Sequence, residues 1–293
     1  MKKLSFTIDR PVQLLEFLIS AMPDKSRTTV KSFLSRRQVS VNHVVTTQFD
    51  RKLKPGDQVE VSSEKGRPEF RHPMVRLVYE DDWLIVIDKK YGLLSIATDK
   101  IVAKTAYHIL SEYVKQEDRR NRIFVLHRLD RETSGLMMFA KSEEIQEKMQ
   151  AHWSETVEER KYYAVAEGVF DKPEGTITSY LAENKAFKVY ATTPDAGKEA
   201  ILDYRVMKQS PEYALLELEL ETGRKNQIRA QLESIKHPIA GDKKYGAQTN
   251  PVGRVALHAG VIAFVHPVTG EAMRFTSPLP SRFNTLFSKR KGK

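Results

Sequence analysis

The feature that most constrains the fold is a run of alternating apolar and acidic residues at 214–221, which reads Ala-Leu-Leu-Glu-Leu-Glu-Leu-Glu. A period of two residues is typical of an antiparallel strand that buries one face and exposes the other. Other strand and helix candidates are mixed without a regular strand-helix-strand rhythm, and they lie at 84–88, 103–115, 123–126, 136–139, 142–153 and 227–234. The sequence therefore predicts an α+β fold rather than a doubly wound parallel sheet.

Positive charge is concentrated in the first quarter of the chain. Residues 1–76 contain 15 lysines and arginines against 8 aspartates and glutamates, whereas the other 217 residues contain 33 and 30. A basic module beside a nearly neutral larger domain suggests an arm that binds a polyanion. A basic surface that is merely solvated explains the charge equally well.

The basic region also has the pattern of a small folded module. We expect one helix to begin at Pro11 and a second to span residues 26–37 with Ser26 as its cap. Short strands are expected at 39–42 and 58–61. The polar, proline-containing stretch that follows is typical of a linker. The predicted parts are therefore a module over residues 1–62, a linker over 63–76 and a larger domain over 77–293.

Several classes of protein are excluded by motifs that the sequence lacks. There is no cysteine, which removes disulfides, zinc–thiolate sites and thiol nucleophiles. We find no phosphate-binding glycine loop, no dinucleotide fingerprint, no serine nucleophile elbow and no metal-ligand spacing among the eight histidines. No apolar run reaches the roughly 18 residues of a membrane helix, and no signal-peptide core follows the N-terminus. We expect a cytoplasmic monomer that uses no metal and no cofactor.

One polar segment lies between two apolar strand candidates and carries a carboxylate. Residues 126–136 read Leu-His-Arg-Leu-Asp-Arg-Glu-Thr-Ser-Gly-Leu, so Asp130 lies in a short loop with Arg128 before it and Arg131 after it. A neighbouring guanidinium would keep the carboxylate ionised and fix its orientation. Such a group can act as a nucleophile or a general base. The alternative is that Asp130 only stabilises a turn and pairs with one of these arginines.

Two further segments have residues suited to RNA contact. Residues 222–229, Thr-Gly-Arg-Lys-Asn-Gln-Ile-Arg, open a helix where backbone N–H groups and cations could bind phosphate. Residues 160–164, Arg-Lys-Tyr-Tyr-Ala, combine cations with aromatic rings that could stack on bases. Each segment also has an ordinary interpretation, a glycine turn before a basic helix and a strand with a core tyrosine.

Together these segments resemble the RluA family of pseudouridine synthases. The resemblance covers about residues 77–283, and its motifs lie at 127–136, 160–168, 222–229, 237–246 and 257–271. It implies the pseudouridine synthase fold, with a mixed and largely antiparallel central sheet. Residues 1–62 resemble, more weakly, the small α/β RNA-binding module first seen in a small-subunit ribosomal protein.

The resemblance implies a role for each of three residues and requires no cofactor. Asp130 would be the catalytic carboxylate and would attack either the ribose C1′ or the uracil ring. Tyr162 would stack on the target base and assist proton removal, and Arg229 would pair with Asp130. Arg128 would help to fill the space left by the flipped nucleotide. RNA contacts are expected from Arg128, Arg131, Arg224 and Lys225, and in the N-terminal module from Arg27, Lys31, Arg36 and Arg37.

The chain departs from the family pattern at three places. Arg160 stands where a lysine is usual. Lys225 and Asn226 replace a threonine–histidine pair. In the N-terminal module, Arg37 and His43 fall where glycines are common in tight turns.

The expected function is the isomerisation of specific uridines to pseudouridine in structured RNA. Large-subunit ribosomal RNA is the expected target, because family members with this N-terminal module tend to act on it, and transfer RNA is an alternative. A second alternative is an RNA chaperone or ribosome-assembly factor that has lost catalysis. The charge distribution would suit it, whereas the intact set of Asp130, Tyr162 and Arg229 disfavours it. A metal-independent ribonuclease would need a pair of histidines that the sequence does not place well.

Overall fold

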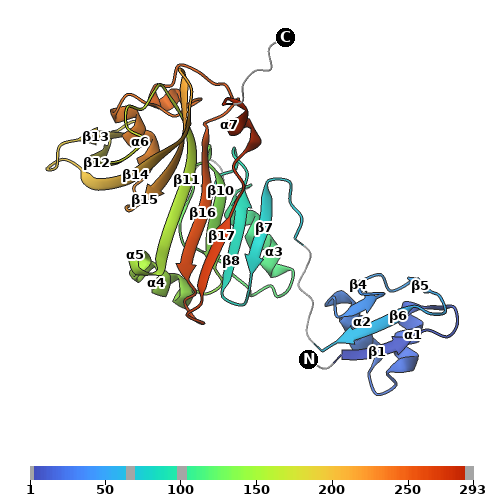
Figure 1. The fold of residues 1–293 in the computed structure, drawn as a ribbon. Coiled ribbons are helices and arrows are strands. Elements are labelled where there is room, and N and C mark those ends of the chain that lie inside the picture. The colour runs from blue at the N-terminus through green and yellow to red at the C-terminus, as the bar shows by residue number, and fades with distance from the viewer. Residues whose placement is uncertain (1–2, 64–69, 98–103, 288–293) are drawn as a thin grey trace, which may run out of the picture. The chain divides into compact units, whose positions relative to one another are not determined.

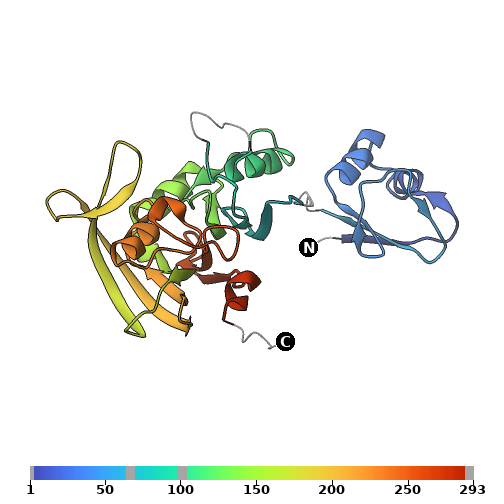
Figure 2. The same ribbon diagram turned by 90° about the horizontal axis from the view of Figure 1, so that it is seen from above.

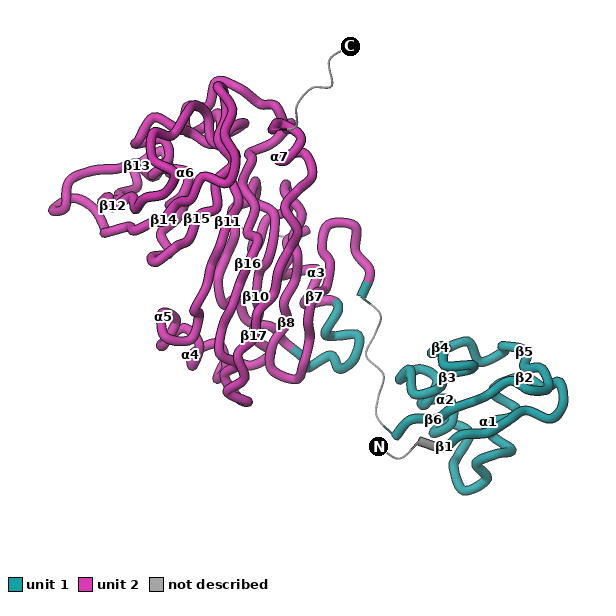
Figure 3. The backbone as a smooth tube through the Cα atoms, viewed as in Figure 1, with its two compact units in different colours: residues 1–70, 113–121 teal, residues 71–112, 122–293 magenta. Residues whose placement is uncertain are grey.

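The computed structural model describes residues 3–63, 70–97 and 104–287. The chain forms two compact units, one made of residues 1–70 and 113–121 and the other of residues 71–112 and 122–293 (Figure 3). Both units contain helices and strands, and the predicted α+β class is confirmed. Among the helices of the described residues, none is long and apolar enough to cross a membrane.

The N-terminal unit packs two helices against a small sheet. The sheet has the order β1 (Lys3–Thr7), β6 (Gln58–Ser62), β3 (Val39–Val41) and β4 (Val44–Val45), and β2 (Val12–Gln13) pairs separately with β5 (Lys52–Leu53). Helices α1 (Leu14–Ala21) and α2 (Arg27–Ser35) bury Leu14, Leu18, Val30 and Leu34 in one core with the valines of β3 and β6.

The structure corrects one helix boundary in this unit and explains two turns. Helix α1 begins at Leu14 rather than at Pro11, because Val12 and Gln13 are held in an extended conformation by pairing with β5. The predicted cap of α2 is confirmed, since the Ser26 hydroxyl accepts a hydrogen bond from the Thr29 amide at 3.1 Å. The turns that lack glycine still form, with φ values of 56° at Arg37 and 64° at His43. This left-handed conformation costs an ordinary residue about 1–2 kcal/mol.

The larger unit is built on an 11-stranded sheet. Its main path runs β13 (Val189–Thr192), β12 (Glu174–Glu183), β14 (Lys198–Gln209), β15 (Tyr213–Leu220), β11 (Val157–Glu167), β16 (Leu257–Val265), β10 (Ser134–Ala140), β8 (Leu84–Lys89) and β7 (Val75–Glu80) (Figure 1). Strand β17 (Ala272–Thr276) pairs with β16, and β9 (Phe124–Val125) pairs with β10. Between the named strands of the described ranges, only β10 and β16 are parallel. The prediction of a mixed, largely antiparallel sheet is therefore confirmed.

Two sequence predictions about strands need adjustment. Strand β7 begins at Val75, inside the predicted linker over 63–76, of which residues 64–69 lie outside the described residues. The alternating run forms β15, but Leu215 and Leu216 are both buried. Because neighbouring side chains of a strand point to opposite faces, both faces of the sheet are covered at this end.

The helices of the larger unit are α3 (Ala106–Lys115), whose residues 113–115 are grouped with the other unit, α4 (Glu143–Ala151), α5 (Trp153–Thr156), α6 (Gln227–Ser234) and α7 (Ser281–Thr285). A 3₁₀ turn, η1 (Lys243–Tyr245), follows α6. The predicted start of α3 at residue 103 lies outside the described residues. The predicted helix over 142–153 is interrupted at His152, which separates α4 from α5. Helix α6 has the predicted bounds.

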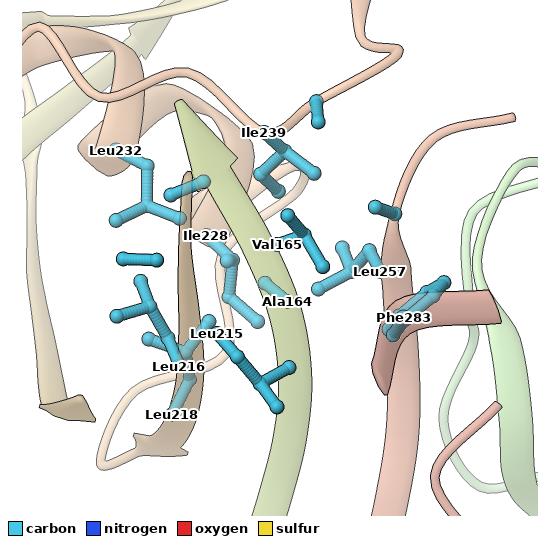
Figure 4. Packing of buried hydrophobic residues seen from close by; sticks show 14 of the residues in the cluster. Ala164, Val165, Leu215, Leu216, Leu218, Ile228, Leu232, Ile239, Leu257 and Phe283 are labelled. Atoms are coloured by element: carbon cyan, nitrogen blue, oxygen red, sulfur yellow. The ribbon is translucent and has the colours of Figure 1, made fainter. Parts of the chain in front are cut away.

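Helix α6 is fixed on the sheet by apolar packing and by two buried amides. Its Ile228 and Leu232 belong to a core cluster with Leu215 and Leu216 of β15 (Figure 4). The Gln227 side chain donates to the Ile201 carbonyl at 3.0 Å, and the Gln231 side chain donates to the Ala200 carbonyl at 3.0 Å. Both side-chain amides are buried. Their hydrogen bonds therefore fix the position of the helix on the sheet, in addition to the packing of its apolar face.

A second core holds β10, the strand that follows the Asp130 loop. Leu136 and Met138 of β10 pack with Leu84 and Val86 of β8 and with Met149 of α4. At the start of β10, a Cβ atom added to Gly135 would lie 2.1 Å from the Ala259 carbonyl oxygen of β16. The glycine of the Thr-Ser-Gly-Leu segment is therefore required by the close approach of β10 and β16.

Candidate active site

The Asp130 loop is held from behind by a buried lysine and a buried serine. The Lys89 ammonium, fully buried at the end of β8, donates to the Thr133 carbonyl at 2.6 Å, the Leu93 carbonyl at 2.8 Å and the Asp130 carbonyl at 3.3 Å. The Ser95 hydroxyl donates to the Leu129 carbonyl at 2.6 Å and accepts from the Leu129 amide at 3.1 Å. The backbone on both sides of the carboxylate is thus fixed by side chains from outside the loop.

Burial changes the pKa of two groups that support this loop. Removal from water lowers the pKa of Lys89 to about 8, and the nearby carboxylates of Asp130 and Glu132 oppose that shift. Burial also lowers the pKa of His127 to about 4, so its imidazole is neutral at neutral pH. The His127 Nε2 atom accepts a hydrogen bond from the Met138 amide at 3.1 Å. His127 therefore ties the loop to β10.

The Asp130 carboxylate is paired with Arg229 of helix α6. The Arg229 Nη1 atom lies 3.3 Å from Asp130 Oδ2, and the Asp130 side chain is 25% exposed while that of Arg229 is 9% exposed. The same guanidinium donates from Nε and Nη2 to the two oxygens of Asp242 at 2.6 and 2.8 Å. Burial alone would lower the pKa of Arg229, but the hydrogen bonds and charge of Asp242 raise it above the usual value. Arg229 is a permanent cation with its direction fixed by Asp242.

Asn226 contacts the carboxylate from the first turn of the same helix. With its Nδ2 atom toward the site, Asn226 donates to the two Asp130 oxygens at 2.5 and 3.0 Å, and its Oδ1 atom accepts from the Tyr245 hydroxyl at 3.1 Å. Its backbone is left-handed, with φ 50°, a conformation that asparagine tolerates better than most residues. The Tyr245 hydroxyl accepts in turn from the Val189 amide of β13 at 3.3 Å. A chain of hydrogen bonds therefore connects the β12–β13 hairpin to Asp130.

An open cavity of about 450 Å³, the active-site cavity, lies in front of the Asp130 carboxylate. Its lining includes Asp130, Arg128, Trp153 and Tyr162, together with Arg224 to Asn226. Burial raises the pKa of Tyr162 to about 12, partly opposed by the charge of Arg160, so the phenol is neutral at neutral pH. The cavity brings the Asp130 carboxylate together with aromatic rings and arginine side chains, which are groups that can hold a flipped nucleotide.

Most of the predicted site residues in this unit meet at the cavity. Asp130, Tyr162 and Arg128 line it, and Arg229 supports Asp130 from a smaller adjoining pocket. Arg224 lines it as well, while its Nε atom donates to the Glu199 carbonyl at 2.9 Å. Lys225 lines the cavity and forms an ion pair with Glu183.

Five predicted RNA contacts lie elsewhere. The Arg131 Nε atom donates to the Gly92 carbonyl at 3.3 Å, and Arg131 is not among the described residues that line the active-site cavity. The other four belong to the N-terminal unit, where Arg27 and Lys31 lie on α2 and Arg36 and Arg37 directly follow it.

The sequence reasoning missed Lys89, Ser95, Asn226 as an Asp130 contact, and the support from Asp242 and Tyr245. A lysine at the end of a largely apolar strand was one available signal for Lys89, because a charged residue there must find several acceptors if it is buried. Asp242 and Tyr245 belong to a motif of the resemblance, but their distance along the chain from Asp130 gave no indication of a contact.

The comparisons with known proteins indicate one family. The family model described as RNA pseudouridylate synthase matches residues 83–234. A relative from Bacillus subtilis, named uncharacterized RNA pseudouridine synthase YlyB, is 34% identical over 274 residues, which cover 90% of this chain and 89% of the relative. The ribosomal large subunit pseudouridine synthase D of Haemophilus influenzae is 31% identical over 293 residues, which cover 94% and 90%.

A solved structure supports the fold independently. Human RNA pseudouridylate synthase domain containing 4 superposes with a TM-score of 0.59 at 23% identity, and the match covers 71% of this chain and 90% of that one. The family match includes the Asp130 loop and the strands from β8 to β15. The chain is therefore a member of the RluA family of RNA pseudouridine synthases.

Proposed function

We propose that this enzyme isomerises uridines in large-subunit ribosomal RNA and that Asp130 is its catalytic carboxylate. The observation that carries the proposal is the position of Asp130, which is partly exposed to the active-site cavity and held by Arg229 and Asn226. A carboxylate that is fixed in place and charge-paired, yet open to a cavity, can attack a substrate without first reorganising.

The reaction rearranges atoms within one nucleoside. The bond between uracil N1 and ribose C1′ breaks, the base rotates, a bond forms between C5 and C1′, and the proton on C5 moves to N1. Asp130 would form a transient bond at C1′ or on the uracil ring and would leave again, so it is regenerated. Because no electrons are gained or lost overall, the proposed chemistry needs no redox cofactor.

The groups around Asp130 suit the remaining parts of the reaction. Extruding a uridine from a stack costs a few kcal/mol, which new stacking and cationic contacts can offset. In the proposal Tyr162 stacks on the flipped base, and Arg128 enters the space that the base leaves. The pKa of about 12 favours stacking by Tyr162 over removal of a proton by it, since a neutral phenol is a weak base.

The choice of RNA rests on the relatives. The Haemophilus influenzae relative is named for the large ribosomal subunit and matches this chain over 94% of its length. A second relative with that name, from Pasteurella multocida, is 31% identical over 291 residues. Because the match extends beyond the catalytic unit, we also propose that the N-terminal unit is the RNA-binding module, with Arg27, Lys31, Arg36 and Arg37 contacting phosphates.

The Asp130→Asn variant tests the catalytic proposal. It keeps the shape of the side chain and removes the nucleophile, so we expect no pseudouridine while the RNA dissociation constant stays within a few-fold of the wild type. Activity of purified Asp130→Asn in a tritium-release assay would refute the role of Asp130.

Mapping of pseudouridines tests the target. Ribosomal and transfer RNA from cells with and without the gene would be compared, and we expect the lost positions to lie in large-subunit ribosomal RNA. Loss confined to transfer RNA would replace the proposed target and leave the chemistry intact. Deleting residues 1–70 tests the module, since fewer phosphate contacts should weaken binding and flatten its salt dependence.

A further inference from the structure

The tip of the β12–β13 hairpin exposes an aromatic ring close to the active-site cavity. Phe187 is 70% exposed, the largest exposed fraction among the large apolar side chains of the described residues. In Figures 1 and 2 the hairpin projects from the edge of the sheet beside helix α6. An apolar ring that is exposed to water has an unfavourable hydration free energy, which a bound partner would relieve.

The tip that carries Phe187 is held in one conformation. The Asn184 side chain accepts hydrogen bonds from the Ala186 and Lys188 amides, both at 3.0 Å, and the Phe187 amide donates to the Asn184 carbonyl at 2.9 Å. Lys244, from the η1 turn, donates to the Phe187 carbonyl at 2.9 Å. Phe187 itself is left-handed, with φ 57°, so the ring is presented by a preformed loop.

Two lysines accompany the exposed ring. Lys225 lies over it, with Nζ 5.5 Å from the ring centre, and Lys244 contacts its backbone. Lys185, next to the tip, is exposed as well. An aromatic face among cations is the arrangement by which proteins bind unpaired bases and their phosphates.

The hairpin is physically continuous with the catalytic groups. A groove of about 670 Å³ separates the hairpin from the segment before helix α6, and Arg224 and Lys225 line both this groove and the active-site cavity. Lys225 precedes Asn226, which contacts Asp130, and Val189 begins the hydrogen-bond chain to the same carboxylate. A strand of RNA with its target nucleotide at Asp130 can therefore pass Lys225 and reach Phe187.

We propose that Phe187 is a stacking platform for an unpaired base that flanks the target uridine, with Lys225 and Lys244 facing the adjoining phosphates. The proposal rests on the function proposed above, because the nucleotide at Asp130 sets the position of its neighbours. Glu183 pairs with Lys225 in the free protein, and both side chains are partly exposed, so a phosphate can replace Glu183. The groove also contains Asp195, which would face the RNA and favour a path along its lysine side.

The Phe187→Ala variant tests the stacking contact, with an unmodified transcript of large-subunit ribosomal RNA as the probe. A stacked base contributes about 1–3 kcal/mol, so the dissociation constant from filter binding should rise by roughly 5- to 150-fold. KM should rise similarly while kcat at saturating RNA stays unchanged, because Phe187 does not touch Asp130. An unchanged dissociation constant would overturn the proposal.

The Phe187→Trp variant provides a direct signal for stacking. It should bind as tightly as the wild type, and RNA should quench its fluorescence beyond the change seen from the two native tryptophans. Additional fluorescence that RNA leaves unchanged would overturn the stacking assignment even if Phe187→Ala binds weakly.

Val268→Ala is the matched control for Phe187→Ala. Val268 is also an exposed apolar side chain, 48% exposed, on another turn of the same unit.

The Glu183→Gln variant tests the lysine separately. Without its ion pair to Glu183, Lys225 should bind RNA more tightly. The slope of the logarithm of the association constant against the logarithm of the salt concentration should steepen by the amount expected for about one phosphate contact. Weaker binding would refute the phosphate role of Lys225. Because these binding measurements do not require turnover, an inactive wild-type enzyme would count against the proposed function and leave the Phe187 result interpretable.

Discussion

Replacing Lys89 by methionine would separate the positioning of the Asp130 loop from the stability of the fold. Methionine fills nearly the same volume but cannot donate to the Thr133, Leu93 and Asp130 carbonyls, which Lys89 contacts at 2.6, 2.8 and 3.3 Å. The loop would lose the side chain that fixes the backbone of the carboxylate. A displacement of about 1 Å at a reacting group can cost on the order of 100-fold, and we expect a fall in kcat of that size.

The expected change in the free energy of unfolding is limited, because two effects of Lys89 oppose each other. Burial lowers its pKa from 10.5 to about 8, which corresponds to a cost of about 3 kcal/mol for keeping the ammonium charged. Removing the lysine abolishes that cost but leaves the Thr133 and Leu93 carbonyls without a donor, at about 1–3 kcal/mol each. At pH 7 the free energy of unfolding should therefore change by no more than about 3 kcal/mol in either direction.

The two contributions can be separated by pH. Between pH 8 and 10.5 the unfolded chain keeps the Lys89 proton and the folded chain has lost it, so this group makes the folded state more stable as pH rises. The difference in unfolding free energy between wild type and Lys89→Met should rise by up to about 3 kcal/mol across that window and stay constant below it. Other titrating groups cancel in the difference.

Tryptophan fluorescence in urea provides the measurement, because Trp83 and Trp153, the two tryptophans of the chain, both lie in the larger unit. The neighbouring Lys90, whose side chain is exposed, supplies the control variant Lys90→Met, for which neither kcat nor the pH dependence should change. A flat difference from pH 7 to 10.5 would show that burial does not lower the pKa of Lys89. An unaffected kcat in Lys89→Met would show that the loop is held without it.

Three further predictions concern the support of the site and the turns of the N-terminal unit. Asp242→Asn leaves the partly exposed Asp130 as the remaining anion beside the buried Arg229 cation, so the larger unit should lose up to about 3–5 kcal/mol in the same fluorescence assay. A loss below about 1 kcal/mol would contradict the pairing of Arg229 with Asp242. Because the pKa of Tyr162 is about 12, the pH profiles of kcat for wild type and Tyr162→Phe should have the same shape up to pH 10. A change in kcat near pH 10 that only the wild type shows would contradict this. His43→Gly removes a strained left-handed residue and should stabilise the N-terminal unit by up to about 1 kcal/mol in hydrogen exchange, whereas faster exchange of its amides would refute the strain.

The parts of the site that the sequence predicts are those that local patterns define. Asp130 lies in a polar loop before an apolar strand, and the bounds of helix α6 follow from its periodicity, so both could be located in advance. The pairing of Asp130 with Arg229 was expected from the family resemblance, and the 3.3 Å contact confirms it.

The parts that could not be predicted depend on contacts between distant segments. In the sequence, Lys89 looks like a charged residue at an exposed strand end. Its burial becomes apparent only from the loop carbonyls that surround its ammonium in the structure. Pro11 has the typical position of a helix start, but pairing between β2 and β5 moves that start to Leu14. Asn226 is a departure from the family pattern, and only its left-handed backbone brings the amide to the carboxylate. Local propensity is in each case overruled by tertiary structure.

The central position of β16 has a consequence for how the enzyme is made. Strand β16 lies between β10 and β11, so it joins the part of the sheet that carries Asp130 to the part that carries Tyr162 and helix α6. Residues 257–265 are among the last of this unit to leave the ribosome, and pairing across more than 100 residues forms slowly. During synthesis the two halves can each form hairpins, but among the strands of the described residues none other than β16 joins them. The nascent chain should thus acquire catalytic competence in one late step, and a chain that ends before β16 should have none.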